Sequence, residues 1–562
     1  MPNPSTARQV NVGTARVRSA AVPRPGERAA DRRDACRRRG RDGAAVVLRA
    51  RESREHGEGR QRVSQGGKVM SEDAPVNSGA VKWPHPDSAY FTVRSMQIKL
   101  HRWAGENSSR RFGDLFNLVC DPAFLVHAWE RVSGNKGART PGVDKATVAM
   151  IETWVGVEEF LGQIRDSLKS GGFRPAEVRQ VTIPKGTPGK FRKLGIPTVA
   201  DRVVQASLKA VLEPIFEADF KPCSYGFRPN RRAQDAIAEI HHYGTSGYRW
   251  VLECDIKACF DEIDHTALMD RLRARIKDKR VCALVKAFLK SGVLTGLGDR
   301  EETLTGTPQG GILSPLLANI ALSALDDHFD RQWHQEMGSD GQRRKRRRDG
   351  KGNWKIIRYA DDFVLMVHGE RRHAEALREE VAAVLAPMGL RLAPEKTAVV
   401  HLDEGFTFLG FDIRRMRKRG TQKYYVYTRP SRKAIQSIKD KVAARTYRST
   451  RHMGLDELIT SLNRSLAGWA NYFRHGVSKA VFSAVDSHAW HRLMRWIRAK
   501  YKQGNHRIGM PELRRRFCDQ GWRFACNGVV YTGASSVTVT RYRYRGNTIA
   551  TPWTPNVAAA NG

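Results

Sequence analysis

The chain has 562 residues, of which 40% are hydrophobic and 8% aromatic, so it is long enough for several domains with a sizeable core. It carries 97 lysine and arginine residues against 58 aspartate and glutamate residues, a net charge of +39. A surplus of this size disfavours a merely basic enzyme and favours a polyanionic partner, most simply a nucleic acid.

Cysteine spacing and hydropathy exclude two further classes. The eight cysteines are scattered without a C-x-x-C pair, which argues against a zinc ribbon and against a disulfide framework. No apolar run is long enough to span a bilayer, so we expect no membrane partner. These features favour a reducing, cytoplasmic location.

The segment 1–69 differs from the rest of the chain. It is rich in Arg, Ala and Gly and contains no Trp, Tyr or Phe, so we expect it to be disordered. One interpretation is an Arg-rich RNA-binding arm. We favour the other, in which this segment lies upstream of the true start at Met70. The segment 70–150 is then an N-terminal extension with a helical pattern, since Trp103, Phe112 and Phe116 share one face.

A basic hairpin with a Pro-Gly turn is predicted at 183–197. Its Lys185, Lys190 and Arg192 could clamp a triphosphate. No G-x-x-x-x-G-K-[ST] loop is present, which disfavours P-loop ATPase chemistry.

Paired carboxylates interrupt an apolar strand pattern at Asp361 and Asp362. Burying two adjacent negative charges is costly, and a divalent cation removes that cost. Asp255 ends an earlier apolar strand and can supply a third carboxylate. Two Mg²⁺ ions on such a set could activate a 3′-hydroxyl and stabilise the leaving pyrophosphate.

Two loops flank these strands. The glycine-rich segment 305–316 opens a helix, and its Gln309 can present a donor and an acceptor to a nucleotide. The Arg-rich stretch within 333–353 is expected to be a charged loop, which is either simply solvated or contacts phosphate.

Long helices are predicted over 431–502, because Leu458, Leu462 and Leu466 lie on one apolar face. Basic residues would crowd the exposed sides, which suits a bundle that lies along a nucleic-acid backbone. The segment 511–562 forms a short tail, and it is a candidate DNA-binding segment.

In chain order, these segments resemble a group II intron-encoded protein, that is, a reverse transcriptase with a maturase domain. The motifs that carry the resemblance are Thr140-Pro141-Gly142-Val143-Asp144, Leu194-Gly195-Ile196-Pro197-Thr198-Val199-Ala200-Asp201-Arg202, Ser224-Tyr225-Gly226-Phe227-Arg228-Pro229, Asp255-Ile256-Lys257, Thr307-Pro308-Gln309-Gly310-Gly311, Tyr359-Ala360-Asp361-Asp362, Glu395-Lys396-Thr397, Phe408-Leu409-Gly410-Phe411 and Gly468-Trp469-Ala470-Asn471-Tyr472-Phe473-Arg474. The last of these resembles the maturase thumb, or domain X, which retron and retroviral enzymes are not expected to carry.

The resemblance implies a role for each matching catalytic residue. Asp255, Asp361 and Asp362 would hold two Mg²⁺ ions, with the Ile256 carbonyl as a further ligand. Lys396 would lie where a general acid for pyrophosphate departure has been proposed, although an unperturbed lysine suits that role poorly.

The substrate-binding roles follow in the same way. The incoming dNTP would be held by Lys185, Arg192, Phe260 and Gln309, with Phe260 as the steric gate that excludes a ribose 2′-hydroxyl. A buried aromatic at a strand-to-helix turn is the structural alternative for Phe260. The predicted primer grip is Phe408, Leu409, Gly410 and Phe411, and the predicted RNA-binding thumb residues are Trp469, Tyr472 and Arg474.

The sequence departs from the family pattern at three places. Arg232 and Gln234 stand where Ser and His are common, and Lys193 stands where Pro or Gln is common. After about residue 510 no His/Asn/His cluster follows, so we expect the subgroup that lacks the C-terminal HNH endonuclease domain.

We therefore predict an α+β fold of the right-hand reverse transcriptase type. Its expected parts are the extension at 70–150, fingers and palm at 151–425, a helical thumb at 426–510 and the tail at 511–562. The expected function is RNA-directed DNA synthesis on the group II intron RNA, primed by target DNA, together with help in splicing. Alternatives are a splicing cofactor with an idle polymerase, or a host-adapted reverse transcriptase in defence or repair. The resemblance implies a bacterial cytoplasmic protein that is nucleoid-associated when it acts on DNA, and it leaves the oligomeric state open.

Overall fold

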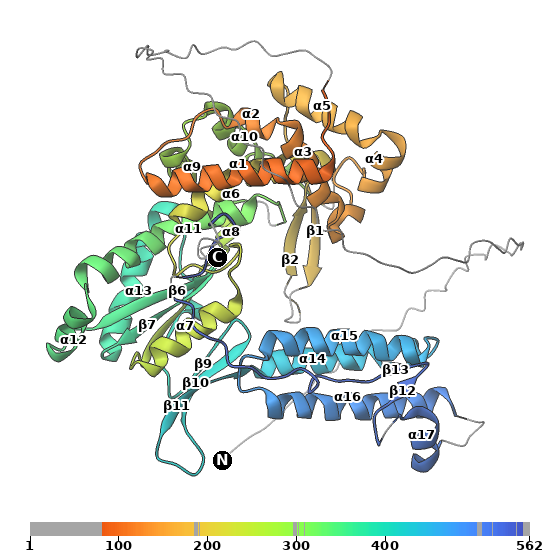
Figure 1. The fold of residues 1–562 in the computed structure, drawn as a ribbon. Helices are drawn as coiled ribbons and strands as arrows, with labels where there is room; N and C mark the ends of the chain where they lie inside the picture. The colour runs from red at the N-terminus through yellow and green to blue at the C-terminus, as the bar shows by residue number, and fades with distance from the viewer. Residues whose placement is uncertain are drawn as a thin grey trace, which may run out of the picture. The chain divides into compact units, whose positions relative to one another are not determined.

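The structure is a computed structural model that describes residues 81–184, 189, 191–295, 300–301, 303–307, 310–502, 508–519, 521–546 and 548–554. These residues belong to one unit, Ser78–Gly562. The expectations for 1–69 and for a start at Met70 therefore lie outside the described residues. Elements carry the labels of Figure 1.

Helices fill the N-terminal extension, as predicted. Helices α1 (Pro86–Glu106) and α3 (Pro122–Ser133) pack against each other and against α6 (Val199–Asp219). Both α1 and α3 start with proline, and the Asp121 side chain accepts a hydrogen bond from the Ala123 amide at the start of α3. The shorter elements of this part are α2 (Phe116–Val119) and a 3₁₀ turn (Lys136–Arg139). Helices α4 (Val148–Trp154) and α5 (Val157–Lys169) follow and lead to the first strand.

The predicted basic hairpin is confirmed by strands β1 (Val178–Pro184) and β2 (Phe191–Ile196). They pair antiparallel, and Ile183 lies opposite Arg192. With β4 (Val293–Leu294) and β5 (Arg300–Glu301) they form a sheet in the order β2-β1-β4-β5.

A second, fully antiparallel sheet occupies the predicted palm, in the order β6-β7-β3-β8. Its strands are β3 (Trp250–Asp255), β6 (Asn353–Tyr359), β7 (Asp362–His368) and β8 (Ala398–His401). The strands at 250–255 and around the paired aspartates are thus confirmed.

Alternate residues of the palm strands enter two different hydrophobic cores. Leu252, Leu365 and their alternate neighbours face a core shared with the N-terminal helices and with α11 (Ser314–Arg331) and α13 (Arg371–Leu385). Val251 and Val364 face a second core with α7 (Ala233–Thr245) and the C-terminal helices. This is the side-chain period of two that a sheet buried on both faces requires.

The remaining helices of this part are α8 (Cys259–Glu262), α9 (His265–Arg275), α10 (Lys279–Leu289), a π turn (Gln332–Glu336), α12 (Asp340–Arg348) and two 3₁₀ turns, Ala386–Met388 and Pro394–Lys396. The expected charged loop at 333–353 is wrong over α12, which is helical. Ser339 and Gln342 form a capping box at its start, and the Arg343 guanidinium lies 4.3 Å from the centroid of the Trp333 ring.

A three-stranded sheet and three long helices follow. The sheet has the order β11-β10-β9, with β9 (Phe406–Phe408), β10 (Phe411–Arg417) and β11 (Tyr424–Pro430). The helices predicted over 431–502 are confirmed as α14 (Arg432–Arg445), α15 (Leu455–Phe473) and α16 (Lys479–Lys500), with a 3₁₀ turn at Arg448–Thr450. Leu458, Leu462 and Leu466 are all fully buried, as their spacing predicted.

The C-terminal segment first adds α17 (Met510–Phe517) at the end of α16, where Phe517 packs on Tyr501, and then β12 (Ala525–Cys526) and β13 (Val529–Val530) beside α15. It then continues as an extended strap. Arg545 donates to the buried carboxylate of Asp235 on α7, and Tyr544 stacks on His242 with 4.6 Å between ring centroids. Trp553 donates to Gln97 on α1 at 3.0 Å. The tail is thus packed against the palm and the N-terminal extension.

We expect Arg545→Ala to lower stability by about 1–2 kcal/mol, because it removes a charge-assisted hydrogen bond from a carboxylate that is 2% exposed. Urea unfolding measures the change. The matched control is Arg543→Ala, two residues away on the same strap and exposed. Equal midpoints for the two variants would show that the strap contributes nothing at this point.

Candidate active site

The structure brings the three predicted catalytic aspartates to one end of the palm sheet. Asp255 and Asp362 lie directly opposite each other on β3 and β7, so their Cβ atoms are cross-strand neighbours. Asp361 lies in the turn between β6 and β7, where Ala360 has a φ of 59°. The hairpin turn therefore presents the pair beside the third carboxylate.

Burial and like charge make these carboxylates harder to ionise. Partial loss of hydration, together with the charges of Asp361 and Asp255, raises the pKa of Asp362 to about 6. The pKa of Asp361 is also raised, first by burial and then by Asp255. The Arg192 guanidinium on β2 opposes both shifts, which places its positive charge within electrostatic range of the pair.

Glu253 is a fourth acidic residue at this site, and sequence analysis missed it. It precedes Asp255 by two residues on β3, so both side chains project from the same face of the sheet. Burial, together with the charges of Asp362 and Asp255, raises the pKa of Glu253 to about 7. The signal was present in the sequence as an acidic residue at strand spacing from Asp255.

Lys396 forms an ion pair with Asp255. Backbone bonds place it there: the Ala393 amide donates to the Asp255 carbonyl at 2.8 Å, and Ile256 forms a bridge with Leu392. The hydrogen bond to Asp255 is the main cause that raises the pKa of Lys396. In this pairing the lysine holds its proton more tightly, so its role as a general acid stays a prediction.

The fully buried guanidinium of Arg358 holds the aspartate turn in place by hydrogen bonds. Arg358 on β6 donates to both carboxylate oxygens of Asp326 on α11, and it also donates to the side-chain oxygen of Asn319 and to the Ala360 carbonyl at 2.9 Å. Its remaining donor reaches the Ser224 hydroxyl at 2.7 Å. Burial acts to lower the pKa of Arg358, but the charge of Asp326 and the hydrogen bonds to it outweigh that effect.

The segment 224–229 also packs closely against this turn. The Tyr225 amide donates to the Arg358 carbonyl at 2.9 Å, and the Asn319 side chain donates to the Gly226 carbonyl at 2.9 Å. A Cβ at Gly226 would collide with the backbone of Tyr359 and Ala360. Glycine is therefore required where the two motifs cross.

Phe260 lies in the short helix α8, five residues after Asp255, and its ring meets the Phe227 ring edge-on with 6.2 Å between centroids. The Thr307 amide donates to the Phe260 carbonyl, and the Gly306 amide donates to the Ile263 carbonyl at 2.8 Å. The glycine-rich loop thus fixes the backbone of the predicted steric gate.

Two of the predicted dNTP-binding residues, Lys185 and Gln309, lie outside the described residues. Gly310, next to Gln309, is described and has a φ of 119°. A Cβ there would lie 2.5 Å from the Gly195 carbonyl oxygen. The glycine-rich loop therefore touches the end of β2, the strand that carries Arg192.

The predicted primer grip and thumb residues pack against each other. Phe408 and Phe411 are buried, so only the Leu409-Gly410 turn is left to reach a primer. The Tyr472 hydroxyl donates to the Leu409 carbonyl at 3.0 Å. The Gln234 side chain, one of the departures from the family pattern, donates to the Tyr472 carbonyl at 2.9 Å.

Trp469 and Arg474 also have internal partners. The Trp469 ring packs on Phe473 and Phe482, with centroid distances of 5.0 and 5.7 Å. Arg474 donates to the Thr538 carbonyl of the tail at 3.1 Å. Their predicted contact with RNA stays a prediction, while the structure shows these side chains holding the thumb together and to the tail.

The donor set suits a hard divalent cation. Carboxylate oxygens are the ligands that Mg²⁺ prefers, and the raised pKa values show a local need for positive charge. The Lys396 ammonium supplies such a charge to Asp255. As the side chains stand, no group of three or more acidic, His or Cys residues within the described ranges is placed to hold a metal ion.

An antiparallel sheet with carboxylates at a hairpin turn, faced by a basic β-hairpin, defines the palm of a nucleic-acid polymerase. Two family models match the chain: reverse transcriptase (RNA-dependent DNA polymerase) over residues 183–413, and the group II intron maturase-specific domain over residues 435–516.

Individual proteins agree with these two matches. The chain is 38% identical to Protein YkfC of Escherichia coli over 360 aligned residues, and this alignment covers 61% of this chain and 93% of that protein. It is 34% identical over 363 residues to the group II intron-encoded protein LtrA of Lactococcus lactis, covering 57% of this chain and 59% of LtrA. Nuclear intron maturase 1 of Arabidopsis thaliana matches at 26% identity over 302 residues, 39% of this chain and 42% of that protein.

The chain belongs to the reverse transcriptase family, in the group that carries a group II intron maturase domain. It is an RNA-directed DNA polymerase, and membership implies dependence on a divalent metal and binding of intron RNA. Within the ranges described, no helix is long and apolar enough to cross a membrane.

We expect Asp326→Ala to destabilise the protein by about 3–5 kcal/mol, because it leaves the Arg358 guanidinium buried without its counter-charge. The double variant Asp326→Leu with Arg358→Met should recover much of this stability, since an apolar pair removes both buried charges. It should still extend primers poorly, because the Ala360 carbonyl loses its donor. Urea unfolding and primer extension measure the two effects, and wild-type extension by the double variant would show that the buried pair does not position the turn.

Proposed function

We propose that this protein copies a group II intron RNA into DNA, using the 3′ end of target DNA as primer and dNTPs as substrates, and that it also helps the RNA fold for splicing. The observation that carries the proposal is the opposition of Asp255 and Asp362 with Asp361 in the adjoining turn, in a chain that matches both family models. We also propose the domain limits predicted from the sequence: an N-terminal extension at 70–150, fingers and palm at 151–425, a thumb at 426–510 and a tail at 511–562.

Each residue at the site has a distinct task in the proposed reaction. Two Mg²⁺ ions would be held by Asp255, Asp361, Asp362 and the Ile256 carbonyl. Asp255 would give up its ion pair with Lys396 when it binds Mg²⁺. When bound, Mg²⁺ supplies Lewis-acid activation of the 3′-hydroxyl and charge stabilisation of the leaving pyrophosphate. Arg192, Lys185 and Gln309 would hold the nucleotide, and Lys396, released from Asp255, would face the departing phosphates.

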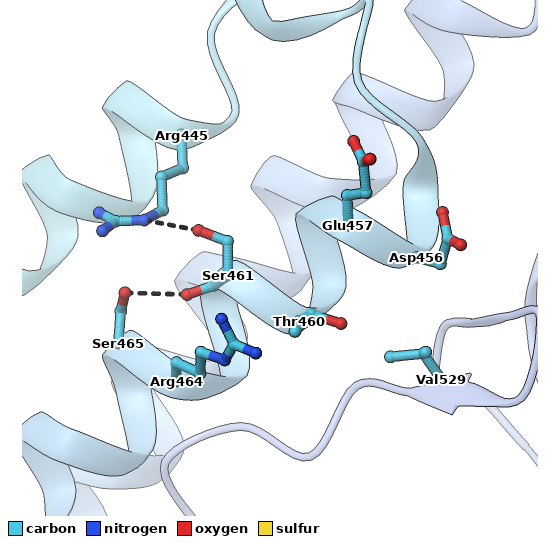
Figure 2. A pocket seen from close by; sticks show the side chains of 8 residues that line it. All are labelled: Arg445, Asp456, Glu457, Thr460, Ser461, Arg464, Ser465 and Val529. Carbon is cyan, nitrogen blue, oxygen red and sulfur yellow. Dashed lines mark hydrogen bonds between the residues drawn. The ribbon is translucent and has the colours of Figure 1, made fainter. Parts of the chain in front are cut away.

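The surface of the thumb supports binding to the phosphate backbone of intron RNA. Exposed cations on its helices are Arg432, Lys433, Lys441, Arg464, Lys479 and Arg495. A pocket of about 440 Å³ lies between α14, α15 and β13 (Figure 2). Arg445 and Arg464 line it, and Arg445 donates to the Ser461 hydroxyl at 3.1 Å. The carboxylates of Asp456 and Glu457 line the same pocket and balance these two positive charges. Support for binding to a phosphate backbone therefore comes from the exposed cations of the helices.

Target DNA places the proposed reaction at the chromosome. We therefore infer that the protein works in the bacterial cytoplasm and associates with the nucleoid while its primer is extended. The alternative of a splicing cofactor with an idle polymerase predicts splicing without DNA synthesis.

Replacing Asp361 tests the metal assignment and separates these alternatives. Asp361→Ala should lower primer extension on an RNA template by about 1,000-fold or more, because a ligand of the catalytic ions is lost. Binding of intron RNA and splicing should stay near wild type, because Asp361 lies at the palm turn and not on the thumb. Both assays are run on wild type and variant in parallel. A wild type that splices but makes no DNA would favour the idle-polymerase alternative, and a variant that still extends primers would refute the ligand role.

Replacing Phe260 tests the steric gate. Phe260→Ala should lower the preference for dNTPs over ribonucleotides by about 10- to 100-fold, because the ring would no longer exclude the 2′-hydroxyl. Single-nucleotide incorporation kinetics measure the ratio. Phe227→Ala is the matched control, since it removes the ring that packs on Phe260. Unchanged discrimination in Phe260→Ala would leave the residue a packing role only.

A further inference from the structure

We propose that the outer face of the β10–β11 hairpin binds an unpaired stretch of RNA. This face consists of Asp412, Arg414, Met416, Tyr425, Tyr427 and Arg429. The inference deepens the proposed function and rests on it, because a folded intron RNA brings unpaired loops to this chain.

The hairpin extends beyond the strand that supports it. Strand β9 pairs with β10 only over Phe411–Ile413, whereas β10 and β11 stay paired as far as Arg417 and Tyr424 (Figure 1). Beyond β9 the Arg415 amide still donates to the Leu402 carbonyl at 2.8 Å, so only the part from Met416 and Tyr425 to the tip is a two-stranded ribbon. A lone ribbon is marginally stable in water, so a binding partner would stabilise it.

Strand register assigns the side chains of the ribbon to two faces. Ile413 and Val426 are buried and anchor the inner face in the core that the thumb shares. Arg415 and Tyr424 continue this inner face toward the tip, where the Arg415 guanidinium lies 4.6 Å from the centroid of the Tyr424 ring and pairs with Asp403. Residues opposite one another share a face, so Tyr425 with Met416 and Tyr427 with Arg414 project outward.

The outer face combines aromatic rings with cations. Tyr425 is 46% exposed, and the Arg429 guanidinium lies 5.2 Å from the centroid of the Tyr427 ring. Tyr425 and Tyr427 are two residues apart on β11, or about 6.8 Å along the strand. Two rings at this spacing suit successive splayed bases. Arg414 donates to the Asp403 carbonyl at 2.8 Å and Arg429 donates to the Met416 sulfur at 3.1 Å, and each guanidinium keeps further N–H donors for the phosphates between the bases.

The charge of the hairpin favours a polyanion over a protein partner. Its lysines and arginines are Arg414, Arg415, Arg417, Lys418, Arg419, Lys423 and Arg429, against a single acidic residue, Asp412. A duplex would offer phosphates to these cations but no free base faces to the tyrosines. Unpaired RNA uses both features of the surface.

Photo-crosslinking tests the proposal on the full chain. The probe is a single-stranded oligouridylate that contains 4-thiouridine, added after a blunt primer–template duplex has saturated the polymerase site. We expect mass spectrometry to place crosslinks on the peptide that carries Tyr425 and Tyr427. Crosslinks confined to other surfaces, or equal crosslinking of the deoxy oligomer, would overturn the assignment to RNA.

A pair of neighbouring tyrosines supplies a matched control for binding measured by fluorescence anisotropy under the same conditions. Tyr425→Ala should weaken oligouridylate binding by about 10-fold, because it removes one stacking platform. Tyr425→Phe should bind as wild type, since the ring is kept. Tyr424→Ala removes a ring of similar exposure, 53%, from the opposite face. It should change binding less than 2-fold, well below the effect of losing a stacked base. Equal effects of the two alanine variants would overturn the assignment to the outer face.

Failure of this inference can be told apart from failure of the proposed function. Primer extension by the wild-type chain on a short RNA template reports on the polymerase alone. Extension without crosslinks on the hairpin would reject only the hairpin site. Crosslinks on the hairpin without any extension would reject the polymerase and keep the RNA-binding surface.

Discussion

The buried ion pair between Arg358 and Asp326 is the interaction on which the turn that carries Asp361 depends. Neither side chain is exposed to solvent, so the desolvation of both charges must be offset within the protein. Arg358 achieves this by donating to Asp326, Asn319, Ser224 and the Ala360 carbonyl at once. One side chain thereby joins β6, α11, the segment beneath the turn and the turn itself. These hydrogen bonds fix the position of the neighbouring aspartates more sharply than apolar contacts alone would.

The palm sheet also helps to fix the position of the aspartates, because its two faces pack into different hydrophobic cores. Residues 252 and 365 tie the sheet to the N-terminal helices, while 251 and 364 tie it to α7 and the thumb. Asp255 and Glu253 follow the register of Val251, so the carboxylates point to the face shared with the thumb. A slip of one residue would turn them to the other face, and burial on both sides penalises such a slip.

Local patterns predicted most of the fold. The β1–β2 hairpin, the palm strands and the helices α14 to α16 all follow from apolar spacing, and the order of motifs placed Asp255 beside Asp361 and Asp362. The pairing of Lys396 with Asp255 was out of reach, because it depends on backbone bonds between segments more than 130 residues apart, such as Asp255 and Ala393. Helix α12 was missed because a run of arginines suggests a solvated loop, whereas the capping box and the Trp333 ring stabilise a helix. The contact of Trp469 and Arg474 with RNA stays a prediction, and sequence could not show that these side chains also have partners inside the protein.

The base of the thumb is fixed to the palm by polar contacts that the tail completes. The Tyr472 hydroxyl donates to the Leu409 carbonyl, and the Gln234 side chain donates to the Tyr472 carbonyl. The tail joins Arg474 to α7 through Thr538 and Arg545. Each such bond contributes about 1 kcal/mol, so a thumb that swung away from its base would have to break several of them together. It follows that the Leu409-Gly410 turn and the end of α15 move as one body. Adjustment to different nucleic acids is then left to the parts with fewer internal contacts, the distal β10–β11 ribbon and the exposed cations of the thumb.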